Sequence, residues 1–258
     1  MEVKLIGECS APLLQSVRTC LLLTTSTWEG QRRLKTIPPS VLFRLCAHTY
    51  LVTVDRGSAN TLDVYRTLAK VFSDAPPALF LQDSVVFPSN VTQDLAASLR
   101  NVDLFVSRGS FGCVTLGSIG PMTCVDPDAQ MFRFDSHFLF AHAVILERKS
   151  LRLLCVTRRP DLTRMEDVLS TLGVASHSYR IPIVSRRIDR DMHLPPVVRR
   201  LLSHPDGWKV LYAACRNPVT TTLGVVNLLC VFCVCLHLVT TLRRSMRERL
   251  ELPSGLMP

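Results

Sequence analysis

Apolar residues in the first part of the chain recur with the period of a helix in some segments and of a strand in others. A helix that begins after Ser10, a residue that commonly caps helices, would place four apolar side chains on one face: Leu13, Leu14, Val17 and Leu21. We therefore expect an amphipathic helix over residues 10–23. The face would be free to bind a partner or would pack on a sheet.

Two further helices are predicted from the same spacing. The first begins near Asn60 and ends before Ala75-Pro76-Pro77, with five residues in phase: Leu62, Tyr65, Leu68, Ala69 and Phe72. The second begins at Pro160 and Asp161 and ends at Gly173, with its own apolar face: Leu162, Met165, Val168, Leu169 and Leu172.

Extended structure is predicted for most of the remaining head. Residues 41–54 are rich in β-branched and aromatic side chains, residues 78–87 resemble a strand, turn and strand, and residues 100–135 are short pieces punctuated by glycine. The clearest hairpin joins residues 137–146 to residues 151–157 through a polar turn. Strands with a few helices, rather than alternating βαβ units, predict an α+β fold: an antiparallel β-sandwich-like head with flanking helices.

The longest apolar run is residues 219–242, which are 24 positions without Asp, Glu, Lys or Arg. As a helix this run would be about 36 Å long, enough to cross a hydrocarbon core of about 30 Å. We predict a single C-terminal transmembrane helix; a buried core helix is the alternative. The N-terminus carries Glu2 and Glu8 and does not resemble a signal peptide, so we expect the head on the cytosolic or nucleoplasmic side.

The chain therefore divides into a globular interaction head (1–179), a basic connector (180–216), an anchor (217–242) and a short basic tail (243–258). The net charge is +9, and the connector alone holds 8 Lys and Arg against 3 Asp and Glu. Basic residues beside an anchor favour anionic membrane lipid rather than nucleic acid, although a solvated linker has the same composition. The side chains expected at the membrane surface are Arg186, Arg187, Arg190, Arg199, Arg200, Lys209, Trp208 and Tyr212.

Catalytic and metal-binding motifs are not found in the sequence. There is no nucleophile elbow, P-loop or dinucleotide fingerprint. His137 and His142 would face opposite sides of a strand, and Asp126 and Asp128 flank a proline as turn formers do. The 10 cysteines are scattered, which favours a reducing compartment without a disulfide framework, and Cys215 is a weak candidate for palmitoylation. We expect a protein that is not an enzyme and that has no metal and no cofactor.

The order of these elements resembles the membrane-anchored nuclear egress protein family of herpesviruses (nuclear egress protein 2). The resemblance rests on LLQSVRTCLLL at 13–23, on TYLVTVDRGSANTLDVYRTLAKVF at 49–72, and on the hairpin, Pro-Asp and helix at 137–173. The C-terminal anchor completes it. The pattern covers most of residues 10–173, and it is similar in the order of elements more than in identity.

The resemblance implies a tail-anchored, single-pass protein of the host inner nuclear membrane, with the endoplasmic reticulum as a second location and with its head in the nucleoplasm. It would recruit a soluble viral egress partner into a heterodimer and a higher-order lattice that coats and buds the membrane around capsids. The groove for this partner would be lined by Leu13, Leu14, Val17, Leu21, Asp63, Tyr65 and Leu68. On this view Leu14→Asp combined with Tyr65→Ala leaves the head folded and abolishes recruitment.

Other classes of protein fit the same pattern. A tail-anchored adaptor of the endoplasmic reticulum or the mitochondrial outer membrane would share the anchor and the basic flanks. A luminal glycoprotein would instead carry a glycan at Asn90 and disulfides.

Overall fold

The structure is a computed structural model. Its described residues are 1–55, 61–72, 77–109, 111–118, 120–135, 138, 141–156, 165–187 and 210. Among them no helix is both long and apolar enough to span a bilayer. The apolar run at 219–242 and the tail at 243–258 lie outside the described residues, so the predicted anchor stays a prediction.

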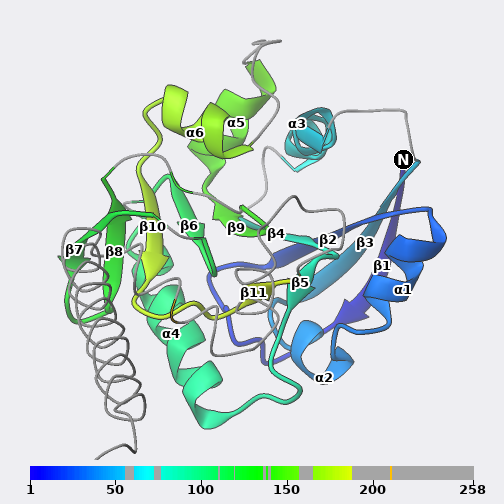
Figure 1. Ribbon diagram of the computed structural model, residues 1–258, viewed down its shortest axis with the longest axis horizontal. Helices are drawn as coiled ribbons and strands as arrows, with labels where there is room; N and C mark the ends of the chain where they lie inside the picture. The colour runs from blue at the N-terminus through cyan, green and yellow to red at the C-terminus, as the bar shows by residue number, and fades with distance from the viewer. Residues whose placement is uncertain are drawn as a thin grey trace, which may run out of the picture. The chain divides into compact units, whose positions relative to one another are not determined.

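A single mixed sheet of nine strands forms the centre of the described head (Figure 1). The spatial order is β1-β3-β2-β4-β9-β6-β10-β8-β7, and two short strands, β11 and β5, pair separately. The bounds of the strands are β1 (Glu2–Glu8), β2 (Thr19–Thr25), β3 (His48–Val54), β4 (Ala78–Gln82), β5 (Val85–Val86), β6 (Cys113–Thr115), β7 (Met122–Asp126), β8 (Met131–Phe134), β9 (Ala143–Leu146), β10 (Ser176–Tyr179) and β11 (Ser185–Arg186).

Most strands of the large sheet run in one direction. β2 is parallel to both β3 and β4, and β10 is parallel to β6. β9 lies between β4 and β6 and is antiparallel to both, so β6 runs in the same direction as β2. The antiparallel pairs of β1 with β3 and of β8 with β7 close the two ends of the sheet.

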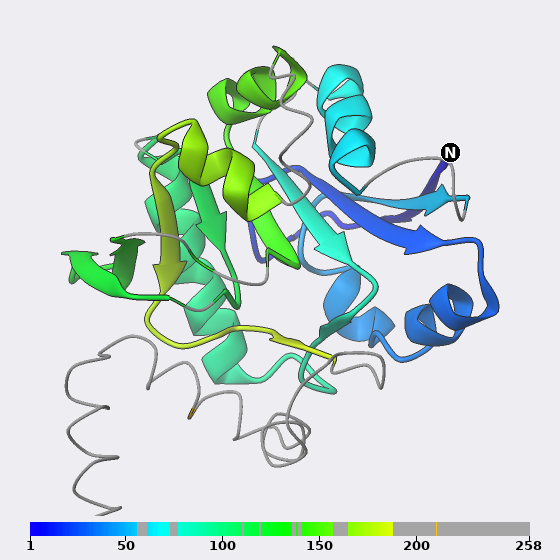
Figure 2. The same cartoon turned by 45° about the horizontal axis from the view of Figure 1, so that its top comes forward.

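Helices cover both faces of this sheet, which makes the head a three-layer α/β structure (Figures 1 and 2). One face packs against α2 and α4, and the other packs against α3, α5 and α6. The helix bounds are α1 (Trp28–Leu34), α2 (Pro39–Leu42), α3 (Thr61–Val71), α4 (Gln93–Ser107), α5 (Arg148–Val156) and α6 (Met165–Thr171).

The alternation of side chains along β2 explains why both faces need helices. Cys20 and Leu22 point into one core cluster, while Leu21 and Leu23 point into the other. A strand that is buried on both faces is apolar throughout and has no polar face to show to water. Burying each leucine contributes about 1.5–3 kcal/mol, so neither layer of helices is dispensable.

The predicted β-sandwich-like α+β head is therefore wrong, because one mixed sheet replaces the two packed sheets. The predicted helix over 10–23 is also wrong: residues 19–25 form the central strand β2. The hairpin partner at 151–157 is instead part of helix α5, and helix α4 occupies a region for which no helix was predicted. Leu-rich segments are compatible with a helix or with a strand buried on both faces, and the period alone does not separate them.

Other predicted elements are confirmed. α3 occupies the second predicted helix, and α6 ends before Gly173, which has the positive φ of 64° typical of a glycine that terminates a helix. β4 and β5 form the predicted strand, turn and strand at 78–87. Asp126 forms the predicted turn, since its Oδ1 accepts a hydrogen bond from the backbone N–H of Ala129.

Candidate functional site

The topology of the sheet identifies a candidate ligand site at the edge formed by the carboxyl ends of β2 and β4. β2 lies between β3 and β4 and is parallel to both, and the chain leaves β2 through α1 and α2 to reach β3 on one side. From β4 the chain leaves through β5 and α4 toward β6, on the other side. The connections after β2 and β4 thus diverge, and in open α/β sheets ligands bind outside the carboxyl ends of strands at such a switch point.

Asp83 follows β4 directly at this switch point. Its side chain is nearly buried, its Oδ2 accepts a hydrogen bond from Thr24 Oγ1 at 2.9 Å, and its Oδ1 lies 3.4 Å from Arg33 Nη1. Its backbone N–H donates to the carbonyl oxygen of Leu23 at 2.9 Å. Three segments that are distant in sequence, the end of β2, helix α1 and the end of β4, therefore meet at one carboxylate.

Burial raises the pKa of the Asp83 carboxyl above its ordinary value. The hydrogen bond from Thr24 and the guanidinium of Arg33 act in the opposite direction but do not cancel the effect. A carboxyl group with a raised pKa, placed at the edge where ligands bind, is typical of functional sites. The charged form of Asp83 also destabilises the fold at neutral pH, because burial deprives the carboxylate of hydration.

Helix α1 is held tightly against the end of β2. Thr27 caps the helix, with its Oγ1 accepting from the backbone N–H of Gly30 at 3.2 Å and lying 2.7 Å from Thr25 Oγ1. A β-carbon at Gly30 would lie 2.4 Å from the carbonyl oxygen of Thr25, so only glycine allows this approach. The close packing places Arg33 of α1 beside Asp83, while Glu29 pairs with the same guanidinium at 2.6 Å.

A second arginine reaches the same edge from the end of the described head. β11 pairs antiparallel with β5, and the backbone N–H of the next residue, Arg187, donates to the carbonyl oxygen of Ser84 at 2.7 Å. The Arg187 guanidinium donates to Thr36 Oγ1 at 2.7 Å, and that hydroxyl donates to the carbonyl oxygen of Arg33. Residues 185–187 therefore bridge the end of β4 to the end of α1.

Two further buried polar side chains, those of Ser84 and His142, belong to the segments at this edge of the sheet. The hydroxyl of Ser84 is buried, and no hydrogen-bond partner for it is found among the described residues. His142 precedes β9, and its carbonyl oxygen accepts from the backbone N–H of Gln82 at 2.8 Å. The buried imidazole of His142 lies close to Gly117, where an added β-carbon would meet Nε2 at 3.1 Å. The segment after β4 thus adds a buried hydroxyl beside Asp83, while the His142 imidazole lies against Gly117.

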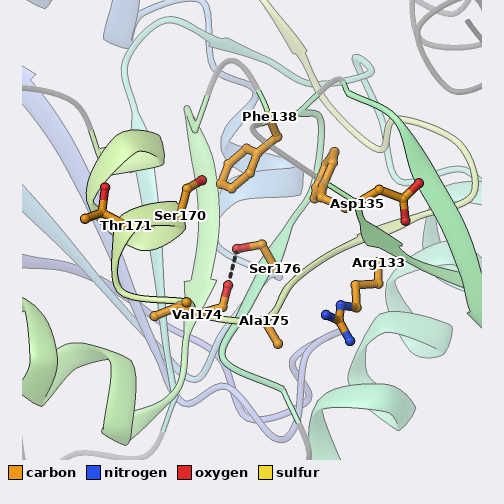
Figure 3. Close-up of a pocket in the computed structure, with 10 residues that line it drawn as sticks. Arg133, Asp135, Phe138, Ser170, Thr171, Val174, Ala175 and Ser176 are labelled. Atoms are coloured by element: carbon orange, nitrogen blue, oxygen red, sulfur yellow. Dashed lines mark hydrogen bonds between the residues drawn. The ribbon is translucent and has the colours of Figure 1, made fainter.

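A separate hollow of about 510 Å³ lies between the end of β8 and the turn from α6 into β10 (Figure 3). The rings of Phe134 and Phe138 stack in it with their centroids 4.8 Å apart, and Ser170 also lines the hollow (Figure 3). Ser176 Oγ donates to the carbonyl oxygen of Val174 on its floor. Because β10 begins here, the hollow is at the opposite edge of the sheet from Asp83.

The residues predicted to form a partner groove do not form one in the described head. Leu14 and Val17 are fully buried in the core cluster on one face of the sheet, and Leu13 packs against it. Leu21, Tyr65 and Leu68 are buried in the cluster on the other face. The sheet separates the two sets, so the groove geometry is corrected: these side chains are core residues.

Asp63 and two of the predicted membrane-surface residues lie within the described part of the chain, and the others do not. Asp63 is exposed on α3 and pairs with Arg66 at 3.0 Å. Arg186 lies in β11 and Arg187 follows it, both half-buried at the edge described above. The others lie outside the described residues: Arg190, Arg199, Arg200, Lys209, Trp208 and Tyr212. His137 also lies outside them, and the predicted exclusion of a metal shared with His142 stays a prediction.

The sequence analysis missed Asp83, Thr24 and Arg33. The available signal was the position of Asp83 directly after the apolar strand ALFLQ, since polar residues that follow a buried strand mark its carboxyl end. The predicted helix over residues 10–23 hid this signal, because it takes up most of the neighbouring strand β2. Without β2 no switch point exists in the predicted fold.

Comparison with known proteins gives only distant structural likenesses. No family model matches the chain, and no curated protein sequence matches it. A UDP-glucose pyrophosphorylase complexed with UDP-glucose is 6% identical, with a TM-score of 0.43, covering 77% of this chain and 98% of that chain. A UTP-bound UGPase from Acinetobacter baumannii is 12% identical, with a TM-score of 0.42 and coverages of 73% and 95%. An inositol-1-phosphate CTP transferase from T. maritima is 11% identical, with a TM-score of 0.38 and coverages of 74% and 96%.

Two expectations find no support in these comparisons. The three proteins named above are enzymes, so the expectation that the chain is not an enzyme is not retained, although likenesses this distant do not show that the chain is one. None of the three is a nuclear egress protein, and describing the chain as a viral egress protein finds no support among them. The TM-scores are below 0.5, so the activity of these neighbours is not transferred on the strength of likeness.

Proposed function

We propose that the head is an enzyme that binds a nucleoside phosphate at the switch point between β2 and β4. The observation that carries the proposal is the meeting of Asp83, Thr24 and Arg33 at the carboxyl edge of two adjacent parallel strands. The connections that follow β2 and β4 diverge at this edge, which is where ligands bind in open α/β sheets.

The chemistry of the edge favours a ligand that carries phosphate and hydroxyl groups. Arg33 and Arg187 bring two guanidinium groups to the edge, and a guanidinium is suited to bidentate recognition of phosphate. The hydroxyl of Ser84 is buried without a partner among the described residues, and it supplies a donor or acceptor for a ligand. A nucleoside phosphate offers both kinds of group.

Asp83 supplies the reactive group in this proposal. Its raised pKa lets the carboxyl exchange a proton closer to neutral pH than an ordinary aspartate does. We assign it the role of accepting a proton from a ligand hydroxyl during transfer of a group to or from the phosphate. Thr24 orients the carboxylate and Arg33 balances its charge.

Binding of UTP to the purified full-length chain in detergent tests the proposal, with UDP-glucose and inorganic pyrophosphate as further probes. We expect saturable binding of UTP that pyrophosphate displaces. Arg33→Gln removes a charge-assisted contact of about 1.5–3 kcal/mol, and we expect it to weaken binding about 10-fold to 100-fold.

A matched control is Arg108→Gln, because Arg108 also pairs with an aspartate, Asp126, but does so on α4 and β7. We expect Arg108→Gln to leave UTP binding unchanged. Equal binding by wild type and Arg33→Gln, or an equal loss in both variants, would overturn the proposed site. Melting temperatures of both variants separate a loss of binding from a loss of folding.

Membrane attachment through residues 219–242 is a separate proposal, supported by the uncharged length of that run. It places the same head at a membrane surface and needs no change in the binding site. The inner nuclear membrane location, the soluble egress partner and the anionic lipid remain proposals that rest on the sequence pattern. Localisation of an N-terminally tagged chain with and without 219–258 tests them, and mitochondrial staining would overturn the nuclear location.

A further inference from the structure

Strand β1 forms one end of the nine-stranded sheet. It pairs with β3, and within the described part of the chain no strand pairs with its other edge (Figure 1). An end strand presents a row of backbone N–H and C=O groups, and such a row is a template on which a strand of another chain pairs. β1 is therefore a candidate interaction surface.

One face of β1 carries apolar side chains. Val3 lies opposite Val52 of β3, and Leu5 lies opposite Tyr50. Directly opposed residues point to the same face of a sheet, so Val3 and Leu5 extend the apolar face that packs against α3. At the end of the sheet these side chains keep much of their surface, since Val3 is 40% and Leu5 is 43% exposed. A further strand beside β1 would bury them.

The other face of β1 carries one acid and one base. Glu2 and Lys4 alternate with the apolar positions and are exposed. Lys4 lies opposite Leu51, whose side chain packs against the other core cluster, so the two charges are on the opposite face from Val3. An acid and a base two positions apart make a strand complementary to an antiparallel copy of itself, because each acid then meets the base of the other copy.

Only one centre of this antiparallel pairing satisfies both faces. With Val3 opposite its own counterpart, Glu2 lies opposite Lys4 of the second copy, and Met1 lies opposite Leu5. A shift by one residue would place apolar side chains opposite charged ones. Centring the pair on Glu2 or on Lys4 would place like charges opposite each other, which is destabilising. The charge pattern therefore selects a second copy as partner and fixes its register.

The regular part of β1 has the length that this register uses. The pairing of β1 with β3 shifts between Leu5 and Gly7, so the register runs from residue 1 to residue 5 and stops before the irregularity. At the other end of the sheet, β7 has five residues and shifts between Cys124 and Asp126. Bulges of this kind protect an end strand from pairing. β1 is thus the better edge for a partner.

We propose that two copies of the chain associate through β1, in antiparallel pairing centred on Val3, and so form a symmetric dimer with one continuous sheet. Each copy uses the same strand, so the contact is closed and a third copy does not add to it. The proposed nucleoside phosphate site contains no residue of β1. The dimer therefore stands or fails independently of that site.

Disulfide trapping tests the register in the full-length chain in detergent, with any tag at the C-terminus. Val3→Cys and Leu5→Cys are compared in a Cys124→Ser background under mild oxidation. Two copies of position 3 would lie with Cα atoms about 4.5–5.5 Å apart, within reach of a disulfide. Two copies of position 5 would be four residues apart along the strands, roughly 13 Å, which a disulfide does not span.

We expect Val3→Cys to form a covalent dimer whose linked peptides join the two copies of position 3. Leu5→Cys is the matched control, since it has the same face and similar exposure, and we expect little dimer from it. Equal trapping of both variants, or no trapping of Val3→Cys, would overturn the proposal.

Sedimentation equilibrium in the same detergent tests the charge pairing. Lys4→Glu places two acids opposite each other twice in the dimer, and we expect the dissociation constant to rise about 10-fold. Glu2→Lys combined with Lys4→Glu exchanges the charges and should restore dimerisation. Both side chains are exposed, so the melting temperature of the monomer should not change. A Lys4→Glu variant that dimerises as wild type does would place the contact elsewhere in the chain, and a monomeric wild type would also refute the dimer.

Discussion

The replacement of Gly30 by alanine tests how closely helix α1 must approach β2. The added β-carbon would lie 2.4 Å from the carbonyl oxygen of Thr25, 2.6 Å from its Oγ1 and 2.8 Å from Thr24 Oγ1. The nearest atom is backbone and cannot rotate away, so α1 must move outward by roughly an ångström to reach an ordinary contact distance.

Two opposing contributions set the change in stability that Gly30→Ala causes. Overpacking of this kind costs about 1–3 kcal/mol, and the backbone contact puts Gly30→Ala near the upper end. Alanine is favoured over glycine in a helix by about 1 kcal/mol, which offsets part of that cost. We expect a net destabilisation of about 2 kcal/mol, and thus a melting temperature lower by about 4–8 °C for a domain of this size.

The same displacement should weaken ligand binding, because it carries Arg33 away from Asp83, which already lie 3.4 Å apart. Thermal melts followed by circular dichroism and UTP titrations measure the two effects. Gly112→Ala is the matched control: its β-carbon would meet Val174 Cγ1 at 2.6 Å, far from the switch point, so it should lower stability and spare binding. An unchanged or raised melting temperature for Gly30→Ala would refute the packing argument.

Three other predictions follow from burial and titration. Leu14→Asp should destabilise the head by more than about 4 kcal/mol, because the side chain has no exposed surface; a folded Leu14→Asp variant in a urea melt would contradict its place in the core. Asp83→Asn should raise the stability of the head at neutral pH. A carboxyl group whose pKa is raised by folding stabilises the fold below its ordinary pKa and loses that contribution as the pH rises through the folded-state pKa. Thermal melts from pH 4 to 7 check that the gain in Asp83→Asn disappears in acid. Burial raises the pKa of Tyr65 to about 12, so wild type should lose stability between pH 10.0 and about 12. Tyr65→Phe should show a smaller alkaline loss and should lose about 1 kcal/mol at neutral pH with the hydrogen bond from Gln82; equal alkaline profiles would count against this assignment.

The stretch from Leu13 to Leu23 explains why the sequence analysis went wrong on the fold. Leu13, Leu14, Val17 and Leu21 match a helical period, yet they are distributed over both faces of the sheet. A strand that is covered on both faces carries apolar residues at every position, so a local pattern cannot reveal its partners. The partners of β2 come from residues 48–54 and 78–82, which only long-range pairing brings together.

The site around Asp83 could not be predicted from the sequence for the same reason. Asp83, Thr24 and Arg33 form no local motif, and their meeting depends on the order of the strands. Where local chemistry dominates, prediction from sequence succeeded: α3 has a strongly periodic apolar face, Gly173 terminates α6, and Asp126 forms its own turn. The predicted Leu14→Asp and Tyr65→Ala double variant, expected to fold, is instead expected to unfold because both side chains are buried.

The most direct test of the central claim is photolabelling of the full-length chain with a photoreactive UTP analogue, followed by peptide mapping. The account predicts label on peptides that contain Thr24 to Arg33 and Asp83 to Phe87, with protection by excess UTP. It also predicts loss of that label in Arg33→Gln and its retention in Arg108→Gln. Protectable label confined to the hollow around Phe138 and Ser170, or no protectable label at all, would contradict the placement of the site at the switch point.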